Sequence, residues 1–196
     1  MSLPLPKVPS SRNPSSAVGR AWELRARILS RSISIVCIGL AFAQLAYSRQ
    51  AATNRAETSQ EMTKAISAIR GAYAAFNRGD FDAAVASLDP NIDWTEPATF
   101  PGGGAYHGRA AVKGYLSQSR SGWAQGASKP VRFILAGNRV VVFVFVRFQP
   151  KGSDSWREAK IADVYTVRRG MIVQMNAFAD REEALRWAGA KPAPGK

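Results

Sequence analysis

A short stretch near the C-terminal end of the chain combines an acid with several hydrogen-bonding side chains. Arg168, Arg169 and Gly170 separate two apolar segments there, and Gly170 can take the positive φ that a two-residue hairpin loop needs. With Arg169 and Gly170 as the loop, the expected cross-strand pairs are Val167 with Ile172, Tyr165 with Gln174 and Asp163 with Asn176. Because paired residues share a face of the ladder, one face would carry a polar set: Asp163, Tyr165, Gln174 and Asn176.

This polar set suits proton transfer. Removing a proton next to a carbonyl group needs a carboxylate base and a donor for the developing oxyanion. Burial raises the pKa of a carboxyl group, which improves a base that works near neutral pH. Asp163 is therefore the candidate catalytic base, with Tyr165 as a donor and Asn176 as an orienting group. The alternative is a structural role, in which Asp163 is a buried acid satisfied by Asn176 or by the backbone.

Glu96 and His107 are two further candidates for catalysis. Glu96 alternates with Ile92 and Trp94 along a short predicted strand, so it points the same way as two apolar residues. It could be a second acid of the pocket or the ion-pair partner of Arg147. His107 ends a glycine-rich loop, where it could be an acid or base at the pocket rim or a plain surface residue. The residues expected to contact a ligand are Trp94, Arg147, Tyr165 and Asn176, although Trp94 also suits a core position.

The elements that must position these residues follow from periodicity. Apolar residues at helical spacing predict a helix from Met62 to Phe76, which Thr58 and Glu61 could cap and which Gly79 would end. Further helices are predicted at 80–88, 109–119 and 181–188, the last one with Asp180 and Glu183 at capping-box spacing. Strands are predicted at 92–96, 131–135, 140–148 and in the hairpin. Helices segregated from an antiparallel sheet indicate an α+β fold.

The predicted strand 140–148 has two apolar faces. Val140, Val142 and Val144 share one face, and Val141 and Phe143 lie on the other. A strand that is apolar on both sides needs a cover on both sides. Helices can cover one face, and a second subunit could cover the other, so the sequence predicts a homodimer.

Composition and net charge limit the kinds of ligand and partner that the chain is expected to bind. The net charge is +13, and it is unevenly distributed. Residues 1–55 hold eight basic residues and one acidic residue, whereas residues 56–196 hold nineteen basic and thirteen acidic residues. The basic excess is concentrated outside the predicted domain, which argues against nucleic-acid binding. With one cysteine and one histidine, an intramolecular disulfide and a zinc site of Cys and His ligands are excluded. No cofactor and no metal are expected.

The N-terminal part resembles a targeting segment. Residues 1–24 are rich in Pro and Ser and are predicted to be disordered. In residues 25–48, arginines precede an apolar run from Ile33 to Tyr47, which is typical of a cleaved signal peptide. An uncleaved membrane anchor with the domain outside is the second interpretation, and a mitochondrial targeting segment is the third. The domain would then be periplasmic, extracellular or held at the inner membrane, and it would meet the membrane only through this segment.

The region from Met62 to Gly189 resembles a known family. Four motifs carry the resemblance, and they are Ala72–Phe81 (AYAAFNRGDF), Trp94–Pro97 (WTEP), Tyr106–Gly108 (YHG) and Asp163–Ile172 (DVYTVRRGMI). They resemble the SnoaL-like branch of the nuclear transport factor 2-like superfamily, whose relatives include ketosteroid isomerase, polyketide cyclases and dehydratases. The resemblance implies a curved antiparallel sheet wrapped into a cone around a pocket, with three N-terminal helices packed over it. It also implies dimerisation through the sheet in many members.

The expected organisation has five parts, and they are residues 1–24 (basic and disordered), 25–48 (signal or anchor), 49–61 (linker), 62–189 (SnoaL-like domain) and 190–196 (tail). The function expected from the resemblance is binding of a small apolar molecule that bears a carbonyl group or a ring, with isomerase, cyclase or dehydratase activity as an extension. Enzymes of the family usually carry a carboxylate base on a late strand, yet the last strand here has no acid. A non-catalytic envelope module that binds or dimerises is therefore the alternative.

Overall fold

The computed structural model describes residues 15–190, and over residues 15–46 this description is limited to the helical backbone. The disorder expected for residues 1–14, the tail from 191 onward and the side chains of the apolar segment up to Ala46 lie outside the described residues. Among the residues that are described, no helix has the length and apolar character needed to cross a membrane. The chain divides into two units between Arg55 and Ala56.

The first helix, α1, spans Ser15–Arg78. It includes residues 15–24 and 49–61, where the sequence predicts disorder and a linker. The segment 49–61 is rich in Ala, Gln, Arg and Glu, which are good helix formers, so its polar composition is compatible with a solvated helix. The helix therefore does not begin at Thr58, and the Glu61 carboxylate instead accepts a hydrogen bond from the backbone N–H of Gly170.

Further along α1, the predicted inward stripe is confirmed, because Met62, Ile69 and Phe76 are buried. Gly79, with a φ of 77°, follows the end of the helix as expected. Asp80 then caps the short helix α2 (Phe81–Val85) by accepting a hydrogen bond from the backbone N–H of Ala83.

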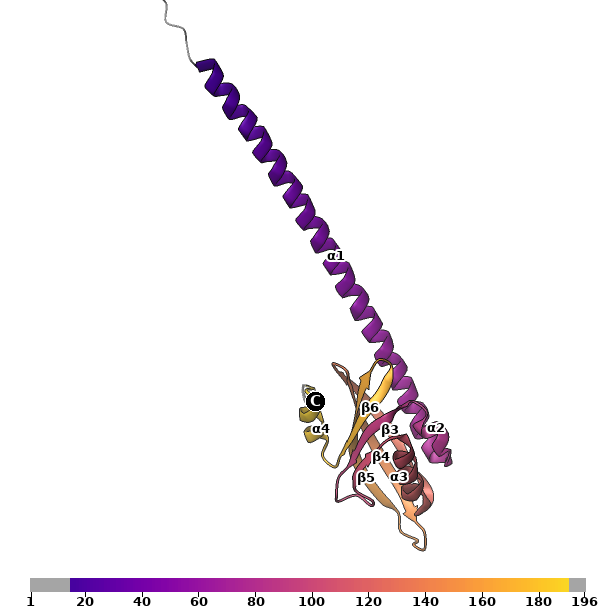
Figure 1. Ribbon diagram of the computed structural model, residues 1–196. Helices are drawn as coiled ribbons and strands as arrows, with labels where there is room; N and C mark the ends of the chain where they lie inside the picture. Colours follow the sequence, from indigo (N-terminus) through magenta and orange to yellow (C-terminus); the bar gives the residue numbers. More distant parts are fainter. Residues whose placement is uncertain (1–14, 191–196) are drawn as a thin grey trace, which may run out of the picture. The chain divides into compact units, whose positions relative to one another are not determined.

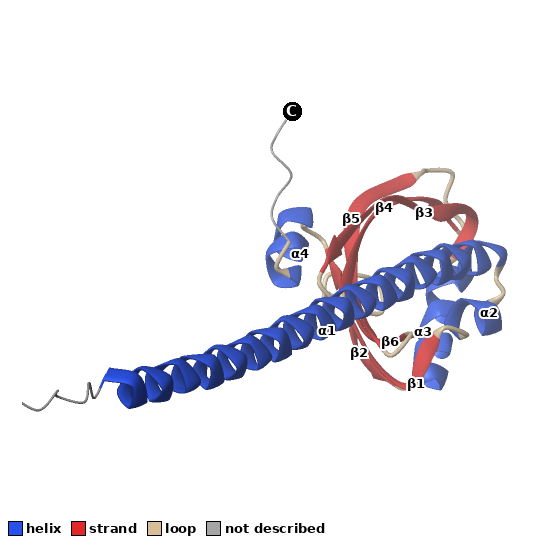
Figure 2. Cartoon of the chain, turned by 90° about the horizontal axis from the view of Figure 1, so that it is seen from above, coloured by secondary structure: helices blue, strands red, loops and turns tan. Residues whose placement is uncertain are grey.

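Six strands form one sheet (Figure 1). They are β1 (Leu88–Glu96), β2 (Gly104–His107), β3 (Trp123–Ala136), β4 (Arg139–Pro150), β5 (Arg157–Arg168) and β6 (Met171–Phe178). Their order across the sheet is β2-β1-β6-β5-β4-β3, and every neighbouring pair is antiparallel except β1 and β6, which are parallel. Strand β2 lies in a segment that the sequence predicts to be a loop. The sheet is strongly curved and remains open (Figure 2).

The hairpin of β5 and β6 has the predicted loop but not the predicted register. Arg169 and Gly170 both have positive φ, and Val167 pairs with Ile172 as expected. The register then shifts, so that Thr166 pairs with Gln174 and Val173 is the extra residue of a bulge. Because side chains alternate with a period of two, a shift by one residue moves every later side chain of β6 to the other face. Asp163 therefore lies opposite Ala177, and Asn176 lies opposite Val164.

The concave side of the sheet holds the main core. Val140, Val142 and Val144 of β4 pack there with Met62 and Ile69 of α1 and with Val112 of α3, which spans Arg109–Ser121. In Figure 2, α2 and α3 lie inside the curve of the sheet and α4 lies outside it. The α+β cone that the sequence predicts is thus confirmed.

The convex side is covered by α4 (Arg181–Ala188). Leu185 and Ala188 pack with Val141 of β4 and Val164 of β5. Asp180 caps α4, as predicted, by accepting a hydrogen bond of 2.7 Å from the backbone N–H of Glu183. A homodimer through β4 needs an uncovered outer face of this strand, but α4 covers the face at Val141, which is fully buried. The homodimer remains a prediction. Only the part of the outer face of β4 that α4 does not cover is left to form its interface.

Candidate active site

A cavity of about 410 Å³ lies on the concave side of the sheet. Its wall is largely apolar and comes from α1, α2, α3 and from strands β1, β3, β4, β5 and β6. Eight of its lining residues carry a polar or charged side chain, and they are Tyr73, Glu96, Tyr115, Ser119, Ser128, Arg157, Asp163 and Tyr165. The two carboxylic acids that the sequence singles out, Asp163 and Glu96, thus line the same cavity.

Asp163 accepts a hydrogen bond from one tyrosine, which in turn accepts a hydrogen bond from a second. The hydroxyl of Tyr73 on α1 donates a hydrogen bond to Oδ2 of Asp163 on β5. The hydroxyl of Tyr165, two residues further along β5, donates to the Tyr73 hydroxyl over 3.2 Å. Asp163 is only 7% exposed, so these hydroxyls form an ordered donor chain that ends on a buried carboxyl group.

Glu96 has an aromatic donor of its own. Nε1 of Trp94, on the same face of β1, donates to Oε1 of Glu96 over 2.8 Å. Glu96 is buried, and hydrogen bonding by Trp94 and by the Tyr115 hydroxyl on α3 lowers the pKa of its carboxyl group against the effect of burial. The Trp94 ring also meets the Tyr165 ring edge to face, with 6.4 Å between centroids. The two carboxyl groups are therefore parts of one aromatic-lined arrangement.

Burial sets the protonation of this pair. Loss of solvation raises the pKa of Asp163 to about 6, and the hydrogen bond from Tyr73 opposes this rise. Loss of solvation also raises the pKa of Glu96, with the negative charge of Asp163 as the second cause, to about 8. Near neutral pH, Asp163 is then largely ionised and Glu96 largely protonated. Two titratable groups with separated pKa values can act as base and acid in one site.

The tyrosines remain donors over the same pH range. Burial, followed by the nearby charge of Asp163, raises the pKa of Tyr73 and of Tyr165 well above the ordinary value. Burial and the charge of Glu96 do the same for Tyr115. The cavity thus offers one carboxylate, one carboxylic acid and three neutral phenol groups to a bound molecule.

The glycine-rich loop before β2 closes part of the cavity wall. Phe100 and Pro101 of this loop line the cavity, and backbone hydrogen bonds from Phe100 to Pro97 and from Gly103 to Phe100 fold the loop tightly. A Cβ at Gly103 would lie 2.0 Å from the carbonyl oxygen of Pro97. Only glycine allows so close an approach, so this position serves the turn.

Asn176 lies outside the cavity, which corrects the predicted pairing with Asp163. The bulge at Val173 places Asn176 on the convex side, opposite Val164 of β5 and Thr95 of β1. Its Oδ1 atom is buried without a hydrogen-bond partner among the described residues. The orienting group for Asp163 is therefore Tyr73, and the predicted contact between Asn176 and a ligand has no support from this geometry.

Arg147 also lies on the convex side. Its neighbours on β4, Val146 and Phe148, line the cavity, so alternation turns Arg147 away from it. Nε of Arg147 pairs with Oε1 of Glu158 over 3.2 Å. The interpretation of Glu96 as the partner of Arg147 is thus wrong, and the interpretation as a cavity acid agrees with the structure.

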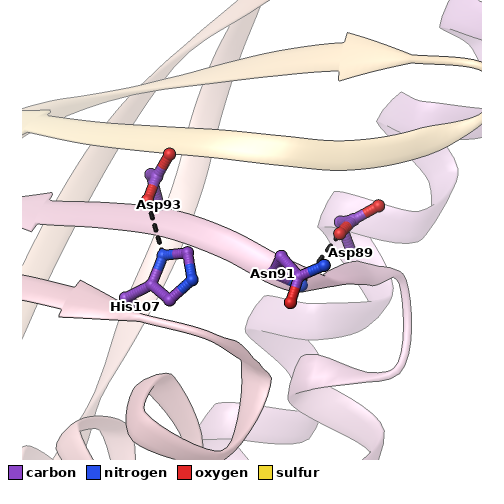
Figure 3. A network of polar contacts seen from close by, with 4 residues as sticks. All are labelled: Asp89, Asn91, Asp93 and His107. Carbon is purple, nitrogen blue, oxygen red and sulfur yellow. Dashed lines mark hydrogen bonds and ion pairs between the residues drawn. The ribbon is translucent and has the colours of Figure 1, made fainter.

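His107 is separated from the two cavity acids. In Figure 3 its ring reaches from β2 toward Asp93 on β1, while Asn91 and Asp89 lie nearer the start of β1. Nδ1 of His107 lies 2.8 Å from Oδ1 of Asp93, and both side chains are about 70% exposed. Asp93 alternates with Trp94 along β1, so the pair is on the face opposite the cavity. The surface interpretation of His107 fits this placement.

Two functional residues were missed by the sequence reasoning. Tyr73 lies in the predicted helix from Met62 to Phe76 and Tyr115 in the predicted helix 109–119, and neither was singled out for its hydroxyl group. The available signal was a hydroxyl group on an otherwise apolar stripe, since a buried phenol usually needs a hydrogen-bond partner.

Among the described residues, no cluster of three His, Cys, Asp or Glu side chains has metal-binding geometry.

The curved sheet, the helices on its concave side and the cavity between them define an α+β cone of the nuclear transport factor 2-like class. A family model described as the SnoaL-like domain matches residues 69–175, more than half of the chain. The chain therefore belongs to the SnoaL-like domain family, and the resemblance drawn from its motifs is confirmed. No curated protein matches the chain in sequence.

Solved structures give the same class. An NTF2-like protein of unknown function from Burkholderia pseudomallei is 26% identical, with a TM-score of 0.54 over 65% of this chain and 98% of that one. TerC, co-crystallised with polyporic acid, is 23% identical, with a TM-score of 0.54 over 65% and 99%. The epoxide hydrolase/cyclase-like enzyme SalBIII, which has a role in pyran ring formation, is 21% identical, with a TM-score of 0.51 over 61% and 92%. TerC and SalBIII are thus similar to this chain in fold.

Proposed function

We propose that the cavity binds a small apolar molecule with a carbonyl group or a ring and transfers a proton on it, as an isomerase, cyclase or dehydratase does. The observation that carries this proposal is the placement of Asp163 and Glu96 in one apolar cavity, each with its own aromatic hydrogen-bond donor. SalBIII acts in ring formation on the same fold, but the proposal rests on the residues of this chain.

In this reaction Asp163 is the base. One of its oxygens is held by Tyr73, which leaves the other to take a proton from the carbon next to the substrate carbonyl. The C–H bond breaks, an O–H bond forms on Asp163, and the electron pair moves onto the carbonyl oxygen. Glu96, protonated near neutral pH, donates its proton or a hydrogen bond to that oxygen. Return of the proton from Asp163 to a different carbon re-forms the C=O bond, any proton on the oxygen goes back to Glu96, and the isomerisation is complete.

The test is proton exchange on a neutral probe. Cyclohexanone and cyclohex-3-en-1-one are incubated with the full chain in D₂O, and loss of the α-proton signal is followed by NMR. We expect exchange above the buffer rate, and a decrease of about a hundredfold or more in Asp163→Asn, the usual scale for loss of a general base. Asp93→Asn is the matched control, because Asp93 is an exposed acid on the opposite face of β1.

Equal exchange in the wild-type chain and in Asp163→Asn would contradict the catalytic role. Saturable binding of a probe without exchange would instead favour a binding module, the alternative in which the same cavity holds a ligand without turnover.

A further inference from the structure

Strand β5 runs along the whole cavity. Its alternate residues all line the wall, and they are Arg157, Ala159, Ile161, Asp163 and Tyr165. With a rise of about 3.3 Å per residue, the six steps from Asp163 to Arg157 span about 20 Å. One strand therefore sets both ends of the binding site, with a buried carboxylate at one end and a guanidinium group at the other.

The cationic end is open to solvent. Gly122, Arg157 and Ala159 line the cavity and are exposed, whereas Asp163 and Tyr165 are buried. Between the two ends the wall is apolar, with Ile161, Val146 and Phe76 among its residues. A ligand that fills the cavity thus has a polar group in the interior, an apolar middle and a second end near solvent.

Arg157 is the single basic side chain among the described residues that line this cavity. Within the described chain it has no ion pair and no side-chain hydrogen bond, since the neighbouring acid, Glu158, turns to the other face and pairs with Arg147. The carboxylate of Asp163 cannot neutralise it, because Asp163 lies about 20 Å away along the strand. A cation without a partner at the rim of an apolar cavity is suited to hold an anionic group of a ligand.

Aromatic rings adjoin this cation. Phe148 is the cross-strand neighbour of Arg157, and its ring stacks on Trp123 with 4.7 Å between centroids. The guanidinium group of Arg120 lies 5.4 Å from the centre of the Trp123 ring. The open end therefore has two stacked aromatic rings, those of Phe148 and Trp123, beside Arg157, and within the described residues no acid lines it.

We propose that the ligand is an elongated amphipathic anion, whose reacting carbonyl or ring lies at Asp163 and Glu96 and whose anionic group, such as a carboxylate, binds Arg157. This inference deepens the proposed function and rests on its assignment of the cavity as a small-molecule site. It assigns Arg157 as the residue that selects charged over neutral ligands of the same length.

The test compares dodecanoate with dodecan-1-ol, which has the same chain and no charge. Binding to the full chain is measured by the fluorescence of its tryptophans, two of which, Trp94 and Trp123, line the cavity. We expect dodecanoate to bind about fivefold or more tightly than the alcohol, the scale of a partly exposed charge-assisted contact. Arg157→Gln should abolish this preference, and Arg157→Lys should retain part of it. Arg147→Gln, on the convex face, is the matched control.

An unchanged preference in Arg157→Gln, equal affinity for the two probes or no binding of dodecanoate would each overturn the inference. The experiment reads only a ratio of affinities and involves no proton transfer. A preference for the acid that depends on Arg157, found in a chain that gives no proton exchange, would leave this inference standing and remove the catalytic proposal alone.

Discussion

The Tyr73 hydroxyl donates a hydrogen bond to the Asp163 carboxylate, although the two residues lie 90 positions apart in the chain. Tyr165 donates to Tyr73 in turn, so Asp163 ends a chain of two phenols. This relationship stabilises the ionised form of a carboxyl group that burial would otherwise keep protonated. It also links helix α1 to strand β5 at the point where the candidate base lies.

Replacement of Tyr73 by Phe tests this link. The variant keeps the ring and removes the donor, so we expect the pKa of Asp163 to rise above its value of about 6. The titration is followed by carboxyl-resolved NMR. Tyr106→Phe is the control, because the Tyr106 hydroxyl bonds the Gly102 carbonyl and has no contact with Asp163. A wild-type Asp163 that titrates at the ordinary value for aspartate would place it in solvent and remove the cavity assignment.

Stability should fall as the pH rises, because Glu96 has a raised pKa in the folded state. Between the ordinary value of 4.5 and about 8, the folded chain holds a proton that the unfolded chain has lost. The stabilising contribution is complete below pH 4.5 and is lost as the pH rises through about 8. Glu96→Gln keeps the shape of the side chain without the charge. The free energy of unfolding should therefore depend less on pH in this variant, and the variant should be more stable than the wild-type chain at pH 9.

The measurement for Glu96 is a series of urea unfolding curves from pH 4 to pH 9. Glu158→Gln is the control, since Glu158 is an exposed partner of Arg147 and should leave the slope of stability against pH unchanged. If Glu96→Gln has the same slope as the wild-type chain, Glu96 is ionised throughout and is not the acid of the site.

The covering of the convex face by α4 can be tested with two adjacent residues. Leu185 is buried against the outer face of the sheet, whereas Arg186 is exposed and forms only a surface pair of 4.0 Å with Glu182. Leu185→Ala should lower the free energy of unfolding by about 2–5 kcal/mol, the usual cost of truncating a buried leucine. Arg186→Ala should cost less than about 1 kcal/mol. Similar costs in the two variants would mean that α4 does not pack on the sheet.

The second unit should fold without the first. Among the side chains that the structure describes, all of the buried core residues follow Ala56, so we expect residues 56–196 expressed alone to be soluble and to unfold cooperatively. Thermal unfolding followed by circular dichroism is the measurement. An insoluble product, or a melt without a transition, would show that the N-terminal segment is needed for folding.

The homodimer prediction now depends on Phe145, because α4 covers the outer face at Val141. Phe145 is partly buried on the same face, next to Lys160 of β5 and Lys129 of β3. If a second subunit packs there, Phe145→Arg should convert dimers to monomers in sedimentation velocity experiments. A wild-type chain that sediments as a monomer at high concentration would refute the prediction.

Within the hairpin, the sequence predicted one strand correctly and the other incorrectly. Alternation along β5 placed Asp163 and Tyr165 on one face, and the structure has both in the cavity. Along β6 the same reasoning failed after Ile172, because a bulge at Val173 shifts the register. The alternation of apolar and polar residues contains no clear sign of an extra residue, so Asn176 was placed on the wrong face.

Local signals were enough for several element ends and for the family, but not for strand β2 or the start of α1. The stop at Gly79, the caps at Asp80 and Asp180 and the loop at Gly170 each depend on the preferences of a few neighbouring residues. Trp94 and Glu96 were placed on one face by their spacing alone. These features are determined within one turn of helix or a few residues of strand, which explains why a single sequence is sufficient for them.

Tertiary structure decided which side chains meet around the two acids. Tyr73 reaches Asp163 from a helix that precedes it by 90 residues, and Arg147 pairs with Glu158 instead of Glu96 because β4 and β5 are neighbours in the sheet. The separated pKa values of Asp163 and Glu96 likewise result from burial by elements scattered along the chain. Residue types and spacing show which groups could do chemistry, but solvation and long-range contact exist only once the sheet has curved around them.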